Sequence, residues 1–167
     1  YFGFTGFSIV ESADSHNHYQ LKRSDGSIAN ETLSEGEVSF ITFLYFYHLC
    51  KGGATEGSIN SNRVIVIDDP ISSLDSNILF VVSSLVKDII YDINNDINHK
   101  IKQLIVLTHN VYFHKEISYT CSKLKEDCRV NFWNLKKAGN VTSIKNYKKK
   151  NPIKSSYELL WQEMREE

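Results

Sequence analysis

The chain has 167 residues, and its hydrophobic content of 41% with 23% charged residues is typical of a folded domain, which excludes a disordered protein. Its net charge of -1 excludes a general electrostatic attraction to nucleic acid or to an acidic membrane. The longest apolar run, residues 40–50, is too short to span a bilayer, and the three cysteines form no C-x-x-C pair. We therefore expect a reduced, cytoplasmic protein with no membrane partner.

The first third of the chain predicts two short strands and a long helix. The strands are expected at residues 7–10 and 19–22, where β-forming residues are bounded by turn residues. A buried helix is expected at residues 36–50, and Gly52 and Gly53 should end it.

The middle of the chain alternates strands and helices. Residues 64–67 and 104–107 are unbroken apolar runs, which are typical of strands that are covered on both faces. Helices are expected at residues 76–94, where apolar residues recur at helical spacing, and at residues 111–124. This alternation predicts an α/β fold with a mainly parallel sheet.

The end of the chain combines strand patterns with positive charge. Strands are expected at residues 130–135 and 141–147 around an Ala-Gly-Asn turn, and residues 155–167 should form a closing amphipathic helix. From Arg129 to Lys154 there are eight basic residues and no acid. Together with aromatic residues such as Trp133, this tract could contact nucleic acid, or it could be a solvated face.

Two adjacent acids, Asp68 and Asp69, follow the first apolar strand. They are expected at the carboxyl edge of the sheet, where open parallel sheets bind ligands. Adjacent carboxylates repel each other and require a cation, a proton or solvent. In nucleotide hydrolysis the first acid holds hydrated Mg²⁺ and the second polarises the attacking water. The same residues are also compatible with a solvated strand end followed by a proline turn.

Three further segments carry groups that suit a phosphate. Ser34 and Gly36 lie at the expected start of a helix, where backbone N–H groups and the Ser34 hydroxyl can bind an anion. The segment Ser72-Ser73-Leu74-Asp75 precedes the next helix and could equally cap it. His109 follows the second apolar strand, and its imidazole could hydrogen-bond a phosphate oxygen.

The order of these segments resembles the heads of ATP-binding-cassette ATPases. Leu33–Glu37 resembles the signature motif of that family, Ile67–Asp69 the end of its Walker B strand, Ser73–Asp75 its D-loop, and His109 its switch histidine. More narrowly, the wording TLSEGE, FLYFY, IDDPISSLDSN, LTHN and PIKSSYELLW resembles the heads of PrrC- and RloC-type anticodon nucleases, bacterial phage-defence toxins that cleave tRNA.

This resemblance implies a P-loop NTPase-like fold, with residues 1–167 as the C-terminal lobe of an ABC-type ATPase head. The sequence contains no G-x-x-x-x-G-K-[ST] phosphate loop, so we expect this Walker A loop on an N-terminal half of the same head. The other implied partner is a second head in a homodimer that encloses ATP. Any contact with tRNA would pass through a nuclease domain outside this chain, and the chain alone should bind ATP poorly.

The resemblance also implies roles for individual residues. Asp68 would hold Mg²⁺ through water, Asp69 would orient the attacking water, and His109 would sense the γ-phosphate. Asp75 would join the two sites of the dimer.

In the dimer, Ser34, Gly36 and Glu37 of one head would contact the γ-phosphate of ATP held by the facing head. Glu35 and Glu37 stand where the family usually has Gly and Gln, and Asp69 stands where most heads have Glu, which places its carboxylate about 1.5 Å further back.

Two other hypotheses remain open at this point. The first is an SMC-like DNA-repair ATPase head, which would act on DNA instead of controlling a toxin. The second is a module that supplies signature contacts in trans and hydrolyses nothing.

Overall fold

The computed structural model describes residues 6–12, 18–29, 31–52, 62–71, 76–123 and 129–153. These residues form three helices and six strands. The closing helix expected at 155–167 lies outside the described residues, as does Asp75.

A β-α-β unit forms the centre of the described structure. Strand β3 (Arg63–Asp68) is followed by helix α2 (Ser76–Asn94) and by strand β4 (Ile101–Leu107), which pairs with β3 in parallel. Helix α1 (Glu35–Gly52) lies beside α2, and α3 (Val111–Lys123) follows β4. The prediction of a helix at 76–94 is confirmed, and the other predicted elements of this unit are each a few residues longer or shorter in the structure.

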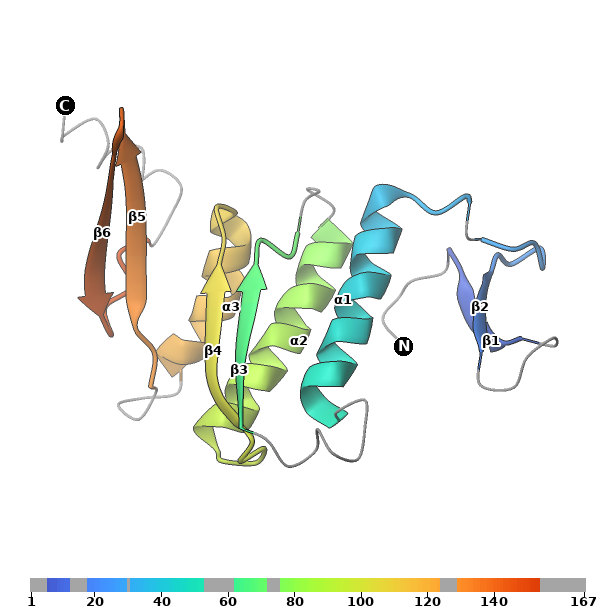
Figure 1. Ribbon diagram of the computed structural model, residues 1–167, viewed down its shortest axis with the longest axis horizontal. Coiled ribbons are helices and arrows are strands. Elements are labelled where there is room, and N and C mark those ends of the chain that lie inside the picture. Colours follow the sequence, from blue (N-terminus) through green and yellow to red (C-terminus); the bar gives the residue numbers. More distant parts are fainter. Residues whose placement is uncertain are drawn as a thin grey trace.

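The remaining four strands form two hairpins, one on each side of the central unit (Figure 1). Strands β1 (Ser8–Glu11) and β2 (Tyr19–Lys22) pair antiparallel, as do β5 (Phe132–Ala138) and β6 (Val141–Lys148). The prediction of a mainly parallel sheet is therefore wrong, because two of the three sheets are antiparallel. The physical reason is that a short connection can only return the chain antiparallel, whereas a parallel pair needs a long crossover such as α2.

The hydrophobic core lies between the helices and one face of the β3–β4 pair. Val82, Val86 and Ile89 of α2 are fully buried, because the helical period places them on one side of the helix. They join a single cluster with residues of α1 and α3, including Phe40 and Phe113. This packing sets the position of both strands, and therefore of the residues that follow them.

The other face of the β3–β4 pair is exposed in this chain. Along β3, Ile65 and Ile67 are each 4% exposed, whereas Val64 and Val66 are 58% and 52% exposed. The exposed Ile105 of β4 belongs to the same uncovered face. The expectation that both strands are covered on both faces is wrong for the described residues, because all three helices pack on one side and successive side chains alternate between faces. No helix in the described part of the chain is both long enough and apolar enough to cross a membrane.

Candidate functional site

The candidate site lies where β3 and β4 end. The register pairs Asp68 with Leu107, so the residues that follow, Asp69 and Thr108, leave the sheet at the same level. The Asp69 N–H donates to the carbonyl oxygen of Leu107 at 2.8 Å, which extends the strand pairing by one hydrogen bond. The backbone of Asp69 is therefore fixed to the end of the neighbouring strand.

The Asp69 carboxylate contacts two side chains from the end of β4. Thr108 Oγ1 donates to Asp69 Oδ1 at 3.0 Å, and His109 Nδ1 contacts Asp69 Oδ2. The His109 side chain is 84% exposed, which leaves its second ring nitrogen, Nε2, accessible from solvent. The structure thus brings together Asp69 and His109, as expected for residues at one sheet edge, and adds Thr108, which sequence reasoning did not assign.

The backbone at Asp69 is unusual, with a positive φ of 43°. This left-handed conformation is rare for residues other than glycine, although aspartate and asparagine tolerate it better than most. Such strain is concentrated at functional sites and in tight turns. Here it accompanies the turn in which the Asp69 carboxylate contacts the end of β4.

The segment that carries Thr108 and His109 is held in place by the start of α3. Thr108 Oγ1 accepts a hydrogen bond from the Asn110 N–H at 3.0 Å. Asn110 Oδ1 in turn accepts from the N–H groups of Tyr112 and Phe113, both at 3.0 Å, and so caps the helix. The segment 108–110 therefore combines a strand end, an exposed histidine and a helix cap.

Asp68 occupies the last position of β3 and is exposed. In the strand alternation it belongs to the uncovered face of β3, with Val64 and Val66. The described residues contain no group of three or more His, Cys, Asp or Glu side chains that could hold a metal ion. A nucleotide-bound Mg²⁺ needs only one or two protein carboxylates, since phosphates and waters supply the other ligands, so Asp68 fits such a role.

Helix starts lie at the same end of the molecule. Figure 1 shows that α1 and α2 begin at the end toward which β3 and β4 run. Helix N-termini carry partial positive charge and unpaired N–H groups, which favour anions. Strand ends bearing carboxylates and a histidine therefore lie at the same end of the central unit as two helix starts.

The start of α1 is closed by a capping box formed by Ser34 and Glu37. Ser34 Oγ accepts from the Glu37 N–H at 3.2 Å, while Glu37 Oε2 accepts from the Ser34 N–H at 2.8 Å and from Ser34 Oγ at 3.1 Å. This reciprocal arrangement satisfies two N–H groups at the helix start. Ser34 and Glu37 therefore have a structural role in addition to the γ-phosphate contact expected of them, and Gly36 between them is half-buried.

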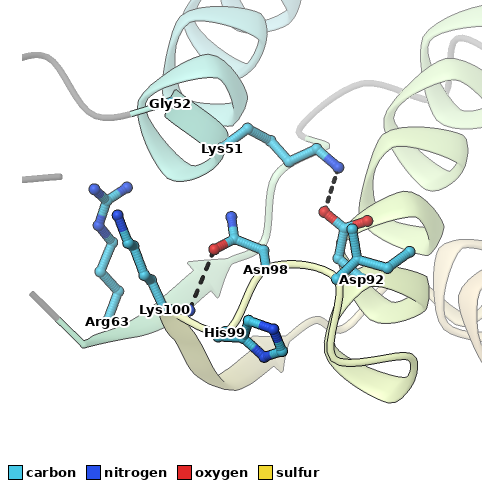
Figure 2. Close-up of a pocket in the computed structure, with 8 residues that line it drawn as sticks. Lys51, Gly52, Arg63, Asp92, Asn98, His99 and Lys100 are labelled. Atoms are coloured by element: carbon cyan, nitrogen blue, oxygen red, sulfur yellow. Dashed lines mark hydrogen bonds and ion pairs between the residues drawn. The ribbon is translucent and has the colours of Figure 1, made fainter. Parts of the chain in front are cut away.

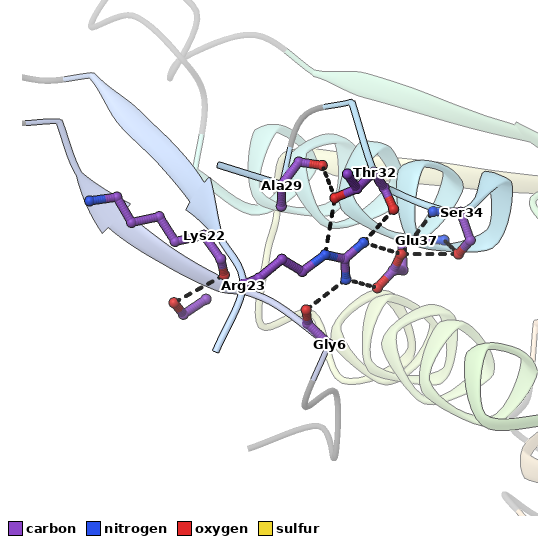
Figure 3. Close-up of polar contacts among 8 residues, drawn as sticks. Gly6, Lys22, Arg23, Ala29, Thr32, Ser34 and Glu37 are labelled. Carbon is purple, nitrogen blue, oxygen red and sulfur yellow. Dashed lines mark hydrogen bonds and ion pairs between the residues drawn. The ribbon is translucent and has the colours of Figure 1, made fainter. Parts of the chain in front are cut away.

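Arg23 ties the β1–β2 hairpin to this capping box (Figure 3). Its guanidinium donates to Glu37 Oε1 at 2.8 Å and to Glu37 Oε2 at 3.2 Å. It also donates to the carbonyl oxygens of Gly6, at 2.6 Å, and of Thr32, at 2.5 Å. Hydrogen bonds from Arg23 and from the Ser34 N–H lower the pKa of the Glu37 carboxyl to about 2. No local pattern around Arg23 signals this role, because its partners come from distant segments.

A hollow of about 390 Å³ lies at the opposite end of the β3–β4 pair (Figure 2). Its lining includes Lys51, Arg63 and Lys100. Arg63 Nη1 donates to the carbonyl oxygens of Leu49 and Cys50, both at 3.0 Å, and Lys51 pairs with two aspartates of α2. Helix C-termini attract cations, so Arg63 serves the end of α1, and the charge of Lys51 is already paired. We therefore place the candidate site at the Asp69 end.

Comparison with known proteins identifies the family. The family described as "AAA domain" matches residues 1–167, and the chain belongs to it. This places the chain in a P-loop ATPase-like family.

Two curated relatives were also found. The uncharacterized chromosomal cassette SCCmec type IVc protein CR006 of Staphylococcus aureus strain MRSA252 is 32% identical over 142 residues, which cover 84% of this chain and 18% of the relative. A protein of the same name from Staphylococcus aureus gives the same values. The chain thus spans less than a fifth of the length of these relatives.

Proposed function

We propose that this chain supplies the Walker B, switch-histidine and signature side of an ATP-hydrolysing head. The observation that carries the proposal is the contact of Asp69 with Thr108 and His109 at the carboxyl ends of two parallel strands. Membership in a P-loop ATPase-like family supports the same conclusion. ATP is the nucleotide that we propose, on the basis of the resemblance of the motifs to ATP-binding-cassette heads.

In this proposal the Asp69 carboxylate accepts a hydrogen bond from a water molecule and orients that water toward the γ-phosphate. Thr108 holds one oxygen of the carboxylate through its hydroxyl, and His109 holds the other. A carboxylate fixed by two partners loses little orientational freedom when a water binds, which is how a positioned base contributes to rate. Asp69 is shorter than the glutamate of most heads, and we propose that its left-handed backbone compensates by bringing the carboxylate over the strand ends.

The contact at Nδ1 determines what His109 can do at Nε2. When Nδ1–H donates to Asp69, a neutral imidazole presents Nε2 as an acceptor, and only the protonated ring can donate there. His109 would therefore bind the γ-phosphate as a cation and lose this contact after the phosphate leaves.

Asp68 is the residue that we propose for Mg²⁺, through a bound water. A bound Mg²⁺ would neutralise phosphate charge during the reaction. Asp68 stands one residue before Asp69, so both carboxylates lie at the same strand end. The D-loop residue Asp75 is proposed to join two such sites, although it lies outside the described residues.

The proposal requires other parts of a complete head. Parallel strands in α/β proteins are covered on both faces, so the exposed Val64, Val66 and Ile105 support a partner layer on that side. We propose that an N-terminal half with the phosphate-binding Walker A loop provides this layer. A second head, in a homodimer, would meet the start of α1.

At the start of α1, Ser34 and Gly36 are proposed to contact the γ-phosphate held by that second head. The Ser34 hydroxyl can keep the hydrogen bond that it accepts from the Glu37 N–H and turn its own proton from Glu37 to a phosphate oxygen. Glu37 remains held by Arg23 during this exchange. Repulsion between Glu37 and the phosphate is reduced by the positive charge of Arg23.

The narrower part of the proposal is that this head regulates an anticodon nuclease of phage defence. It rests on the resemblance of TLSEGE, IDDPISSLDSN and LTHN to PrrC- and RloC-type heads. In that case the tRNA-cleaving domain lies outside this chain, and ATP-driven opening and closing of the heads would restrain or release it.

The test of ATP hydrolysis is Asp69→Asn in the full-length protein. Asparagine keeps the side-chain shape and tolerates a left-handed backbone, so the variant removes mainly the charge. We expect turnover to fall by about a hundredfold or more while ATP binding is retained. Asp96→Asn is a matched control, because Asp96 also has a positive φ, of 52°, but follows α2 at the far end of the strands. Normal ATP turnover in Asp69→Asn would refute the proposed role.

A further inference from the structure

The β5–β6 hairpin, hereafter the ribbon (residues 132–148), stands apart from the hydrophobic core. None of its residues is buried, and none belongs to the core cluster. Figure 1 shows it at one end of the molecule, beside α3. A two-stranded ribbon that adds nothing to the core has little stability of its own. We therefore ask what its exposed side chains bind.

The base of the ribbon is fixed to α3. Asn151 Nδ2 donates to Ser118 Oγ at 3.0 Å, and His114 Nε2 donates to Asn151 Oδ1, also at 3.0 Å. The His114 ring meets the ring of Phe132 edge-on, with centroids 5.9 Å apart. The ribbon therefore has a defined position at its base and projects from it.

The ribbon and the residues next to it carry a concentrated positive charge. Residues 129–153 contain seven of the 19 basic residues of the chain and none of its 20 acidic residues. Because the chain as a whole carries a net charge of -1, this charge is a local feature and not a property of the average surface. A surface of this kind attracts a polyanion.

One face of the ribbon also presents exposed apolar side chains. The register pairs Trp133 with Asn146 and Leu135 with Ile144, which places these four side chains on the same face. Trp133 is 53% exposed, and Leu135 and Ile144 are more so. Lys137 belongs to this face as well, two residues beyond Leu135.

The opposite face and the base carry most of the lysines. Lys145 lies with Nζ 5.2 Å from the centroid of the Tyr147 ring, and Lys136 belongs to the same face. An extended chain lying along the Trp133 face would thus meet Lys137 on that face, with further lysines on the opposite face and at the base of the ribbon.

We propose that the ribbon binds single-stranded nucleic acid, with Trp133 stacking on a base and lysines contacting the phosphates. An exposed indole within a basic, acid-free tract offers the two interactions on which single-strand binding depends, stacking and phosphate neutralisation. A protein partner could cover Trp133, Leu135 and Ile144, but it would also have to carry enough negative charge to neutralise the basic residues of this tract. This inference does not rest on ATP hydrolysis, because the ribbon lies outside the Asp69 site.

The experiment uses the 167-residue chain without nucleotide, with the second tryptophan replaced by Trp161→Phe so that fluorescence reports Trp133 alone. A uridine 15-mer, a thymidine 15-mer and a DNA duplex of equal length are titrated against it at several salt concentrations. We expect either single strand to quench the Trp133 fluorescence and the duplex to bind more weakly without quenching. Trp133→Ala should weaken single-strand binding by about tenfold, measured by anisotropy of the labelled strand.

A pair of charge variants provides the matched control. Lys137→Gln with Lys145→Gln removes two exposed ribbon charges, whereas Lys102→Gln with Lys115→Gln removes two exposed charges from β4 and α3. The ribbon pair should reduce the slope of log K against log salt by about 1.4, and the control pair should leave it unchanged. Circular dichroism checks that each variant is folded, and Trp133→Phe should retain part of the binding.

Three results would overturn the proposal. The first is the absence of Trp133 quenching by both single strands, and the second is an equal effect of the two charge pairs. The third is binding to phosphatidylserine vesicles without binding to either single strand, which would assign the ribbon to a membrane surface. Loss of ATP turnover in the Asp69→Asn variant has no bearing on any of these measurements.

Discussion

The Asp69 carboxylate and the His109 imidazole, which follow two different strands, contact each other at one edge of the parallel pair. The contact couples an acid suited to orienting water with an imidazole suited to binding a phosphate. It also explains the residues around it. Thr108 and Asn110 are hydrogen-bonded to each other on either side of His109. On the other strand, Asp69 has a left-handed backbone at the position where its carboxylate makes this contact.

Thr108→Val tests whether Asp69 needs its second partner. Valine keeps the shape of the side chain but removes the hydroxyl that donates to Asp69 Oδ1. In the full-length protein we expect kcat to fall by about tenfold to a hundredfold, because a less well-oriented carboxylate positions water poorly. The KM for ATP should change little. Thr42→Val on α1 is the control, since it removes a similar hydroxyl hydrogen bond, to the Val38 carbonyl oxygen, away from the site.

Glu37→Gln should destabilise the chain in a pH-dependent way. The pKa of Glu37 lies near 2 instead of 4.5, so its charged form contributes stability above about pH 4.5 that is lost as the pH falls toward 2. The wild type should therefore unfold at higher urea concentration than the variant at neutral pH, and the difference should shrink between about pH 4.5 and pH 2. Urea titrations followed by circular dichroism measure the difference, and a gap independent of pH would contradict the Arg23–Glu37 pairing.

Gly6→Ala tests how closely the backbone at Gly6 packs against the Arg23–Glu37 pair. A Cβ at Gly6 would lie 2.5 Å from Glu37 Oε1 and 3.3 Å from Arg23 Nη1, and Arg23 holds the carboxylate in place. We expect a loss of about 1–3 kcal/mol in the free energy of unfolding, typical of overpacking. Gly52→Ala is the control, because a Cβ there meets nothing within 4 Å and alanine is the better helix former. Equal stability of the two variants would show that the Gly6 contact is not tight.

Ile65→Ala and Val66→Ala compare the two faces of β3. In the 167-residue chain, Ile65→Ala should cost about 2–5 kcal/mol, because it opens a cavity in the core. Val66→Ala should cost about 0.5 kcal/mol or less there, since Val66 is on the exposed face. Urea unfolding measures both values.

The same Val66→Ala change tests the proposed partner layer in the full-length protein. If another part of a head covers this face, the substitution should speed hydrogen exchange of the β3 amides in the full-length protein. An unchanged exchange rate would show that the face stays exposed. Ile65→Ala serves as the positive control for faster exchange.

Local pattern was sufficient to locate most elements. The helix at 76–94 was predicted to the residue, because its apolar positions recur at helical spacing and most of them form its buried face. The strands at the centre and the hairpin after α3 were also found, since β-branched runs and an Ala-Gly-Asn turn are local signals. The positions of Asp69 and His109 after two apolar strands were enough to predict a common edge.

Other features depended on the tertiary structure. Apolar runs alone did not reveal that β3 and β4 are covered on one face only, because coverage depends on where α1, α2 and α3 pack. The partnership of Arg23 with Glu37, and that of Thr108 with Asp69, join residues that are distant in sequence, and such pairs leave no periodic pattern. The sequence by itself determined where helices, strands and chemically active residues occur, since these follow from nearest neighbours along the chain. Only the fold decided which of those residues meet, because contacts between distant segments are set by how the elements pack.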